Sequence, residues 1–223
     1  LHSLFGEAGY MWLRATAMGT VPPATADRPS LRARIAATPS LWLLRRRTRK
    51  QLALLLRVSA YQIFHDGVFN ADPHPGNVLL LADGRLGLID YGNVARFSHA
   101  QRRKLAQLIL ALGDCSNTTR VAEEARSVGF ITRNMRPHVL VQLAHFFFDR
   151  DMDAQHSPAR TLRLLHAQDP IVQLPEDYVL AARVSLLLRG TAQLMAQQHI
   201  STASAWRNEA RLFLQQGYKK AAQ

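Results

Sequence analysis

The stretch FNADPHPGNVLLLADGRLGLIDYGN, residues 69–93, decides how this chain is interpreted. Its first part holds Asp72 and Asn77 within a short polar segment. Pro73 and Pro75 lie between them, and each proline fixes its own φ angle and removes a backbone donor. We therefore expect the residues from 68 to 77 to form a loop of restricted conformation.

Two apolar runs follow this loop, at residues 78–81 and 85–89. Ala-Asp-Gly (82–84) separates them, and an Asp-Gly pair between apolar runs favours a β-hairpin. Asp90 comes directly after the second run. Because a hairpin returns the chain to its starting edge, we expect Asp90 to lie opposite Asn77.

The three polar residues Asp72, Asn77 and Asp90 suit a nucleotide site that contains Mg²⁺. One carboxylate can orient a nucleophile or accept its proton, while an amide and a second carboxylate supply hard oxygen ligands. The alternative is structural: Asp72 before Pro73 can form an Asx turn, and Asp83-Gly84 is typical of a turn. The spacing and the hairpin together favour the functional interpretation.

The composition excludes several classes of protein. The chain has 223 residues, of which 48% are hydrophobic and 20% are charged, enough for a core and too apolar for general disorder. Uncharged apolar runs such as 52–56 are far shorter than the ~20 residues of a membrane span. Its single cysteine, Cys115, excludes a disulfide scaffold and a cysteine-based zinc site.

The N-terminal part carries much of the net charge of +12. Residues 1–50 are rich in arginine and poor in acids, as organelle transit peptides are. We expect residues 1–30 to be a poorly ordered leader or linker, with prolines at 22, 23 and 29. The arginine run 45–49 suits anionic lipid or the solvated face of a helix. No aromatic residues interleave it, so we do not expect nucleic-acid binding.

The rest of the chain is predicted to be mainly α-helical, with one short β-hairpin. Apolar residues between 52 and 63 recur at helical spacing, and Gly67 is a plausible end of that helix. Five residues are expected to begin later helices by capping or by standing in their first turn: Ser98, Asn117, Pro137, Pro175 and Ser204.

Asp-x₄-Asn, followed thirteen residues later by Asp-aromatic-Gly, resembles the catalytic loop and the Asp-Phe-Gly element of protein kinases. The fuller string ADPHPGNVLLLADGRLGLIDYG resembles the ADCK/UbiB (AarF-type) family of atypical kinases. Residues 175–190 and 200–206 are similar to the helical tail of that family, so the resemblance covers roughly residues 50–217. It implies a kinase-like C-terminal lobe, ATP with Mg²⁺, and a role in quinone or prenyl-lipid metabolism in mitochondria, chloroplasts or bacteria.

The resemblance also implies roles for individual residues. Asp72 corresponds to the catalytic aspartate, and Asn77 and Asp90 correspond to the metal ligands of the cofactor site. His74 stands where many kinases have a phosphate-contacting lysine, so it either contacts a phosphate of the nucleotide or caps the loop. Asn70 replaces the usual histidine, and Tyr91 replaces the usual phenylalanine.

A kinase also needs an N-terminal lobe with a glycine-rich phosphate cover and a strand-borne lysine. None of the lysines (Lys50, Lys104, Lys219 and Lys220) lies on an apolar strand before the loop. We therefore expect residues 31–217 to form the C-terminal lobe alone, residues 218–223 to form a tail, and Mg-ATP binding to be weak.

About eight residues separate Asp90 from Ser98, which leaves little room for a peptide-docking segment. ATP hydrolysis or phosphorylation of a small molecule is therefore favoured over protein phosphorylation. The expected partners are ATP, a lipid or quinone-pathway substrate or protein complex, and a membrane surface. The competing hypothesis is a non-catalytic helical remnant that acts as an interaction or lipid-binding module.

Overall fold

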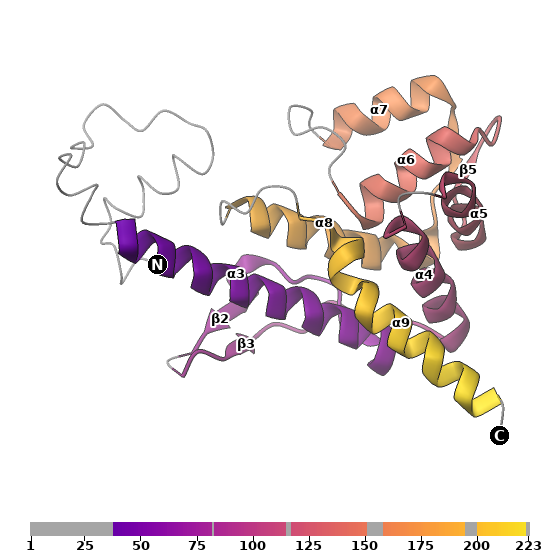
Figure 1. The fold of residues 1–223 in the computed structure, drawn as a ribbon. Helices are drawn as coiled ribbons and strands as arrows, with labels where there is room; N and C mark the ends of the chain where they lie inside the picture. The colour runs from indigo at the N-terminus through magenta and orange to yellow at the C-terminus, as the bar shows by residue number, and fades with distance from the viewer. Residues whose placement is uncertain (1–37, 82, 115–116, 151–157, 195–199, 222–223) are drawn as a thin grey trace, which may run out of the picture.

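The structure is a computed structural model that describes residues 38–81, 83–114, 117–150, 158–194 and 200–221. The expected leader at residues 1–30 and Cys115 lie outside these ranges. The helices are α3 (Thr38–Tyr61), α4 (His99–Leu112), α5 (Thr118–Val128), α6 (Pro137–Phe148), α7 (Pro158–Gln168), α8 (Val179–Leu194) and α9 (Thr202–Ala221). The strands are β1 (Val68–Asn70), β2 (Val78–Leu80), β3 (Leu86–Leu88), β4 (Val94–Arg96), β5 (Ile131–Thr132) and β6 (Ile171–Gln173). The prediction of a mainly α-helical fold is confirmed (Figure 1).

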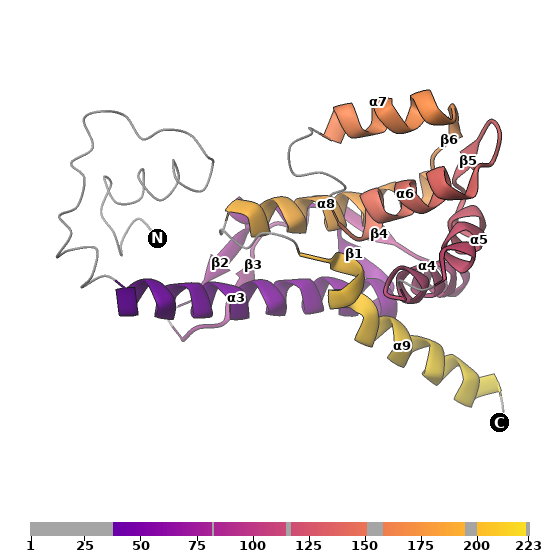
Figure 2. The ribbon, with the colours of Figure 1, turned by 45° about the horizontal axis from the view of Figure 1, so that its top comes forward.

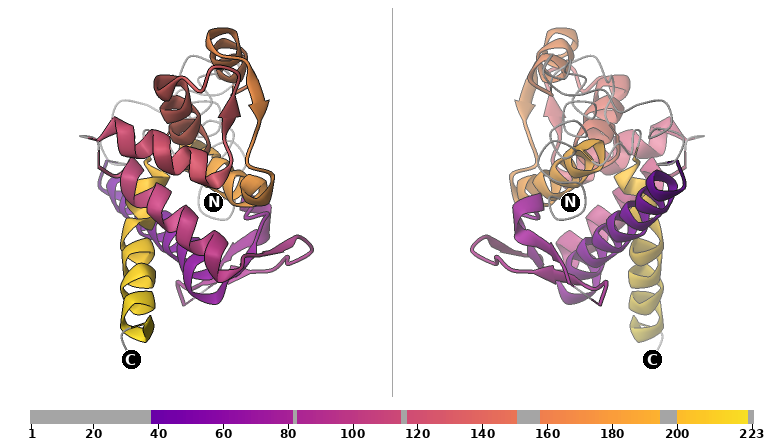
Figure 3. Two further views of the ribbon diagram at one scale, coloured as in Figure 1. Left: turned by 90° about the vertical axis from the view of Figure 1, so that its right-hand side faces the viewer. Right: turned by 90° about the vertical axis from the view of Figure 1, so that its left-hand side faces the viewer.

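Helix α3 is a long element that runs along one side of the fold and packs mainly against helix α9. Its buried face follows the predicted spacing, with Leu52, Leu55, Leu56 and Ser59 all nearly inaccessible to solvent. Figure 3 shows the strands of the 68–96 segment on one side of α3 and helix α9 on the other. The segment with the polar loop is therefore attached to the outside of a helical core.

The end of α3 is fixed by a tight turn and by an arginine from another helix. A π-helical turn, Gln62–Asp66, extends α3, and Gly67 ends it with a φ of 70°. Arg102 of α4 donates hydrogen bonds to the carbonyls of Phe64 (3.2 Å) and His65 (2.9 Å). These are carbonyls that a helix end leaves without partners, so Arg102 joins α4 to the start of the strand segment.

Helix α9 closes the core by packing across both α3 and α4 (Figure 2). Trp206 is fully buried and meets Phe64 edge to face, with 6.4 Å between the ring centroids. Glu209 is also buried, and its two carboxylate oxygens each lie 3.1 Å from a partner, Arg57 or His65. A buried carboxylate is stable here because both of its oxygens have partners.

The β2–β3 hairpin forms as predicted, and two further strand pairs were not expected. In the hairpin Val78 lies opposite Leu88 and Leu80 lies opposite Leu86. The prediction that residues 68–77 form only a loop is wrong at its start, because 68–70 is strand β1 and pairs with β4. The tract after residue 92 was expected to be helical, but it first forms β4. Strands of three residues are too short to give a recognisable alternation of polar and apolar residues.

Most of the predicted helix starts are confirmed. Ser98 accepts a hydrogen bond from Gln101 in a capping box, Asn117 caps α5, and Pro137 is the first residue of α6. Two predicted starts differ in detail. The segment after Pro175 begins with a 3₁₀ turn, Glu176–Tyr178, before α8. The last helix begins at Thr202 rather than after Ser204.

The start of α9 is joined to the end of α6 by Asp149. The side chain of Asp149 is buried; it accepts a hydrogen bond from the Ser201 hydroxyl and pairs with His145 at 2.7 Å. Burial tends to raise the pKa of Asp149, but these hydrogen bonds and the charge of Arg150 lower it overall. Because Ser201 also accepts from the Ser204 backbone, Asp149 fixes where α9 begins.

A third buried carboxylate, Asp169, organises the turn before α6. Its oxygens accept hydrogen bonds from the Thr132 hydroxyl (2.7 Å), the Asn134 backbone and side chain (2.9 and 3.0 Å) and the Arg136 backbone (3.0 Å). Burial acts to raise the pKa of Asp169, but these donors lower it to about 2. The β5–β6 region is therefore built around one ionised side chain.

Candidate functional site

The polar loop begins from a strand that is anchored in the core. In β1, Phe69 is buried and lies opposite Ala95 of β4. The backbone of Ala71 donates a hydrogen bond of 2.9 Å to the carbonyl of Asn93, so the pairing continues one residue into the loop. Asp72 therefore follows a segment that is held by its pairing with β4 and by the buried ring of Phe69.

Asn70 connects the loop with the segment after the hairpin. Only 5% of this residue is exposed. Its side-chain nitrogen donates a hydrogen bond of 2.6 Å to the backbone carbonyl of Asp90, and its side-chain oxygen accepts one of 2.8 Å from the backbone of Asp72. One buried amide thus holds the backbones of the two predicted site carboxylates near each other.

From the sequence, Asn70 was noted only as a departure from the kinase pattern. Its position two residues before Asp72 was the signal that could have identified it. An asparagine at that position can donate to one backbone and accept from another, since its amide carries both functions.

Asp72 is part of an ion pair with a distant helix. Its carboxylate lies 3.0 Å from Nη2 of Arg183 in α8, and the two side chains are 34% and 46% exposed. Arg183 is 111 residues further along the chain, and no sequence pattern indicated this contact. The carboxylate of Asp72 is therefore partly accessible to solvent, and the positive charge of Arg183 lies beside one of its oxygens.

Asn77 ends a short 3₁₀ turn, Pro75–Asn77, that brings it back toward Asp72. Its backbone donates to the carbonyl of His74 at 2.8 Å, and its side-chain nitrogen lies 3.5 Å from the carbonyl of Asp72. No group within the described part of the chain donates a hydrogen bond to its side-chain oxygen. That oxygen is available to a ligand.

His74 caps the same turn. Its Nδ1 accepts a hydrogen bond of 3.1 Å from the backbone of Gly76, and the residue is exposed. Of the two roles weighed for His74, the capping role is present in the structure. The other ring nitrogen has no partner among the described residues.

Asp90 follows the hairpin, but Ile89 rather than Asp90 lies opposite Asn77, so the predicted pairing is wrong by one residue. The backbone of Ile89 donates to the carbonyl of Asn77 at 3.1 Å, which places Asp90 one residue beyond the paired base of the hairpin. One oxygen of the exposed Asp90 carboxylate accepts from the Gly92 backbone at 2.8 Å. Its second oxygen has no partner in the described ranges, so Asp90 and Asn77 each have a free oxygen.

These oxygens fit a hard divalent cation in type and number. Mg²⁺ takes oxygen ligands, is commonly held by one or two protein side chains, and completes its shell with water and substrate phosphates. Asp90 and Asn77 could supply the protein ligands.

An apolar surface lies beside these groups. Leu79, Leu81 and Ile89 are all exposed on the hairpin. A Cβ atom placed on Gly87 would lie 3.6 Å from Leu81 and 3.7 Å from Leu79, so these two leucines lie on the same face of the hairpin as Gly87. Ile89 is two residues beyond Gly87, so it lies on that face as well. Val78 and Leu88 pack against the core from the opposite face. The hairpin therefore presents an apolar face to solvent.

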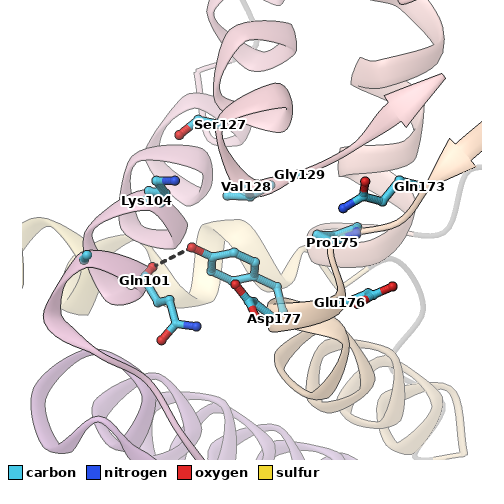
Figure 4. A pocket seen from close by; sticks show the side chains of 11 residues that line it. Gln101, Lys104, Ser127, Val128, Gly129, Gln173, Pro175, Glu176 and Asp177 are labelled. Carbon is cyan, nitrogen blue, oxygen red and sulfur yellow. Dashed lines mark hydrogen bonds between the residues drawn. The ribbon is translucent and has the colours of Figure 1, made fainter. Parts of the chain in front are cut away.

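A separate cavity of about 370 Å³ lies away from the loop, between α4, the end of α5 and the segment before α8 (Figure 4). Lys104 and Ser127 lie on one side of it, and Gln173 and Glu176 on the other. Tyr178 also lines it and donates a 3.3 Å hydrogen bond to the carbonyl of Gln101. Burial, with a smaller effect of the Asp177 charge, raises the pKa of Tyr178 to about 12. None of the predicted site residues lines this cavity.

Residues 44–125 match the family model of the ABC1 atypical kinase-like domain. The predicted resemblance to ADCK/UbiB atypical kinases is confirmed. The matched range runs from α3 into α5, so it contains the polar loop and the hairpin with Asp72, Asn77 and Asp90. Helix α8 with Arg183 lies beyond it.

Individual relatives agree with this match. An uncharacterized protein of Synechocystis is 35% identical over 134 residues, which cover 54% of this chain and 32% of the relative. The chloroplastic protein ACTIVITY OF BC1 COMPLEX KINASE 1 of Arabidopsis thaliana is 39% identical over 49 residues, or 22% of this chain and 7% of the relative. The chloroplastic protein ACTIVITY OF BC1 COMPLEX KINASE 3 of the same plant is 23% identical over 142 residues, which cover 61% of this chain and 20% of the relative. The chain thus spans a third or less of the length of each.

No helix in the described ranges has both the length and the apolar character that are needed to cross a membrane.

Proposed function

We propose that this chain carries the phosphoryl-transfer part of an ABC1-type atypical kinase and uses ATP with Mg²⁺. The observation that carries the proposal is the buried side chain of Asn70, which hydrogen-bonds to the backbones of Asp72 and Asp90 together. Two short backbone segments that each bear a carboxylate are held in one place by a single amide. Such preorganisation is what a phosphoryl-transfer site requires.

In this proposal each residue has a separate task. Asp72, accessible at the edge of the loop, orients the attacking hydroxyl or water and takes up its proton. Asn77 and Asp90 direct their free oxygens to the metal. A metal held by these two residues would supply positive charge to stabilise the phosphate oxygens. The exposed face with Leu79 offers an apolar surface against which the nucleotide base can lie.

The acceptor is proposed to be water or a small molecule rather than a protein. The residues between Asp90 and Ser98 contain β4, which is paired with β1. A segment held in this way is not free to form a docking surface for a peptide. By analogy with the ABC1 kinase relatives, whose names place them in the chloroplast, we propose a chloroplast location. The role that we propose in quinone or prenyl-lipid metabolism rests on the resemblance to the ADCK/UbiB family alone.

We further propose that the described helices and hairpin correspond to the C-terminal lobe of a kinase. Within residues 38–221 we identify no glycine-rich phosphate cover ahead of the loop. Without it, most contacts to the phosphates come from the metal and from the loop. Mg-ATP binding by this chain is therefore expected to be weak, with a dissociation constant near the millimolar range, about −4 kcal/mol.

The test is a titration of the isotope-labelled chain with Mg-ATP, followed by NMR. We expect shifts of the backbone resonances of residues 72–77 and 89–92 that require Mg²⁺ and are lost in Asp90→Asn. Asp83→Asn at the exposed hairpin tip is the matched control and should bind as the unchanged chain does. Absence of magnesium-dependent shifts in the unchanged chain would reject the proposal in favour of a non-catalytic interaction or lipid-binding module.

A further inference from the structure

The ion pair between Asp72 and Arg183 brings a positive charge to the loop from another part of the fold. The segment 68–84 contains no lysine or arginine. His74, which stands where a phosphate-contacting lysine is common, uses Nδ1 to cap its own turn. The guanidinium of Arg183 therefore supplies the cation that contacts the loop carboxylate, at 3.0 Å.

Most of the donors on Arg183 remain available. A guanidinium has five N–H donors in a planar fork, and the contact with Asp72 uses one of its terminal nitrogens. Elsewhere in the described part of the chain, Arg183 has no further hydrogen bond or ion pair. Its side chain is 46% exposed, so the unused donors face solvent beside Asp72.

We propose that Arg183 is the phosphate-contacting cation of this site, supplied in cis by α8. The inference rests on the proposed function. In the transfer, a bond forms between the attacking oxygen and the γ-phosphorus, and the bond to the β–γ bridging oxygen breaks. ADP leaves with the electron pair, and Asp72 takes up the proton. Arg183 binds oxygens of the transferred phosphoryl group, where a planar fork matches their geometry.

If the role of Arg183 were purely structural, its loss would lower the stability of the fold. Ion pairs between half-exposed side chains contribute little to stability, because both groups are already well solvated. α8 is also held by buried residues such as Ala181, Val184 and Leu188. Under the proposed role, loss of Arg183 should therefore leave the thermal midpoint of unfolding unchanged while it weakens phosphate binding about tenfold.

The experiment follows the side-chain Nε–H resonance of Arg183 during a titration with inorganic tripolyphosphate. A site-specific signal is needed because a chain of net charge +12 binds polyanions at many places. Arg183→Ala identifies the resonance by its loss. We expect a saturable shift, and we expect the shifts of the loop backbone at residues 72–77 to weaken about tenfold in affinity in Arg183→Ala. Arg183→Lys should retain part of the binding, and Arg163→Ala on the exposed face of α7 should retain all of it.

The outcomes separate this inference from the proposed function. Unchanged loop shifts with tripolyphosphate in Arg183→Ala, or no binding at the loop at all, would overturn the inference. If Mg-ATP binding is lost in Asp90→Asn but is the same in Arg183→Ala as in the unchanged chain, the proposed function stands and the inference fails. If tripolyphosphate binding depends on Arg183 but no magnesium-dependent nucleotide binding exists, the anion site stands and the kinase proposal fails.

Discussion

The side-chain amide of Asn70 donates a hydrogen bond of 2.6 Å to the backbone carbonyl of Asp90, twenty residues further along the chain. The same side chain accepts from the backbone of Asp72. The relative position of the two predicted site carboxylates therefore depends on one buried residue that carries no charge.

Asn70→Ala should destabilise the fold and uncouple the two segments. The substitution leaves the Asp72 N–H and the Asp90 carbonyl without this partner, and such a loss costs about 1–3 kcal/mol for buried groups. The measurement is the free energy of unfolding in urea. Asn208→Ala, on the exposed face of α9, should change that free energy by less than about 0.5 kcal/mol. Equal effects of the two substitutions would contradict the role assigned to Asn70.

In any longer form of the protein that hydrolyses ATP, Asp90→Asn should reduce turnover more than His74→Ala. The amide keeps an oxygen but loses the negative charge that a hard cation prefers. His74 caps a local turn through Nδ1, and its other nitrogen can add at most one hydrogen bond to a phosphate, worth ~1.5–3 kcal/mol if charge-assisted. Steady-state rates of ATP hydrolysis by the two variants test this order. A larger loss of turnover in His74→Ala than in Asp90→Asn would contradict the assignment of Asp90 as a metal ligand.

Gly67→Ala and Gly190→Ala should have opposite effects on stability. Gly67 has a φ of 70°, and a Cβ there would lie 3.1 Å from both Arg102 and the carbonyl of Phe97, so alanine should cost about 1–2 kcal/mol or more. Gly190 is inside α8, and a methyl group there would have nothing within 4 Å, so alanine should gain about 0.5–1 kcal/mol. Thermal unfolding of both variants tests the pair, and a stabilised Gly67→Ala would mean that the turn is not as described.

The contribution of Asp169 to stability should depend on pH at the acid end. Its pKa is lowered from 3.8 to about 2 in the folded chain, so folding favours the ionised form. The stabilisation is complete above the unfolded pKa and is lost as the pH falls from about 4 to about 2. The difference in thermal midpoint between the unchanged chain and Asp169→Asn should be constant from pH 5 to 7 and should shrink below pH 4. A difference that does not change between pH 5 and pH 2 would contradict the prediction.

The sequence predicted those parts of the structure that depend on neighbouring residues. The hairpin follows from an Asp-Gly pair between apolar runs, and the starts of α4, α5 and α6 follow from Ser98, Asn117 and Pro137. Each of these signals acts within a few residues, so one sequence is sufficient to recognise it.

The missed features join residues that are distant along the chain. The β1–β4 pairing links strands of only three residues, and the contact of Asp72 with Arg183 spans 111 residues. Strands of three residues are too short to show a periodic pattern. A single arginine on an exposed helix face is common in any protein, so it gives no signal of its partner. For the candidate site, the sequence therefore predicted Asp72, Asn77 and Asp90, whereas the contacts of Asn70 and Arg183 with this loop came only from the structure.

The packing of α9 across α3 and α4 has a consequence for how the chain is made. Phe64, just beyond the end of α3, has Trp206 and Phe213 of α9 as aromatic neighbours. Glu209 of α9 is the carboxylate that contacts Arg57 and His65. During translation the apolar face of α3 emerges from the ribosome well before the residues that cover it. A nascent chain that has reached α8 still exposes this surface, so it should be a target for chaperones until α9 has been synthesised.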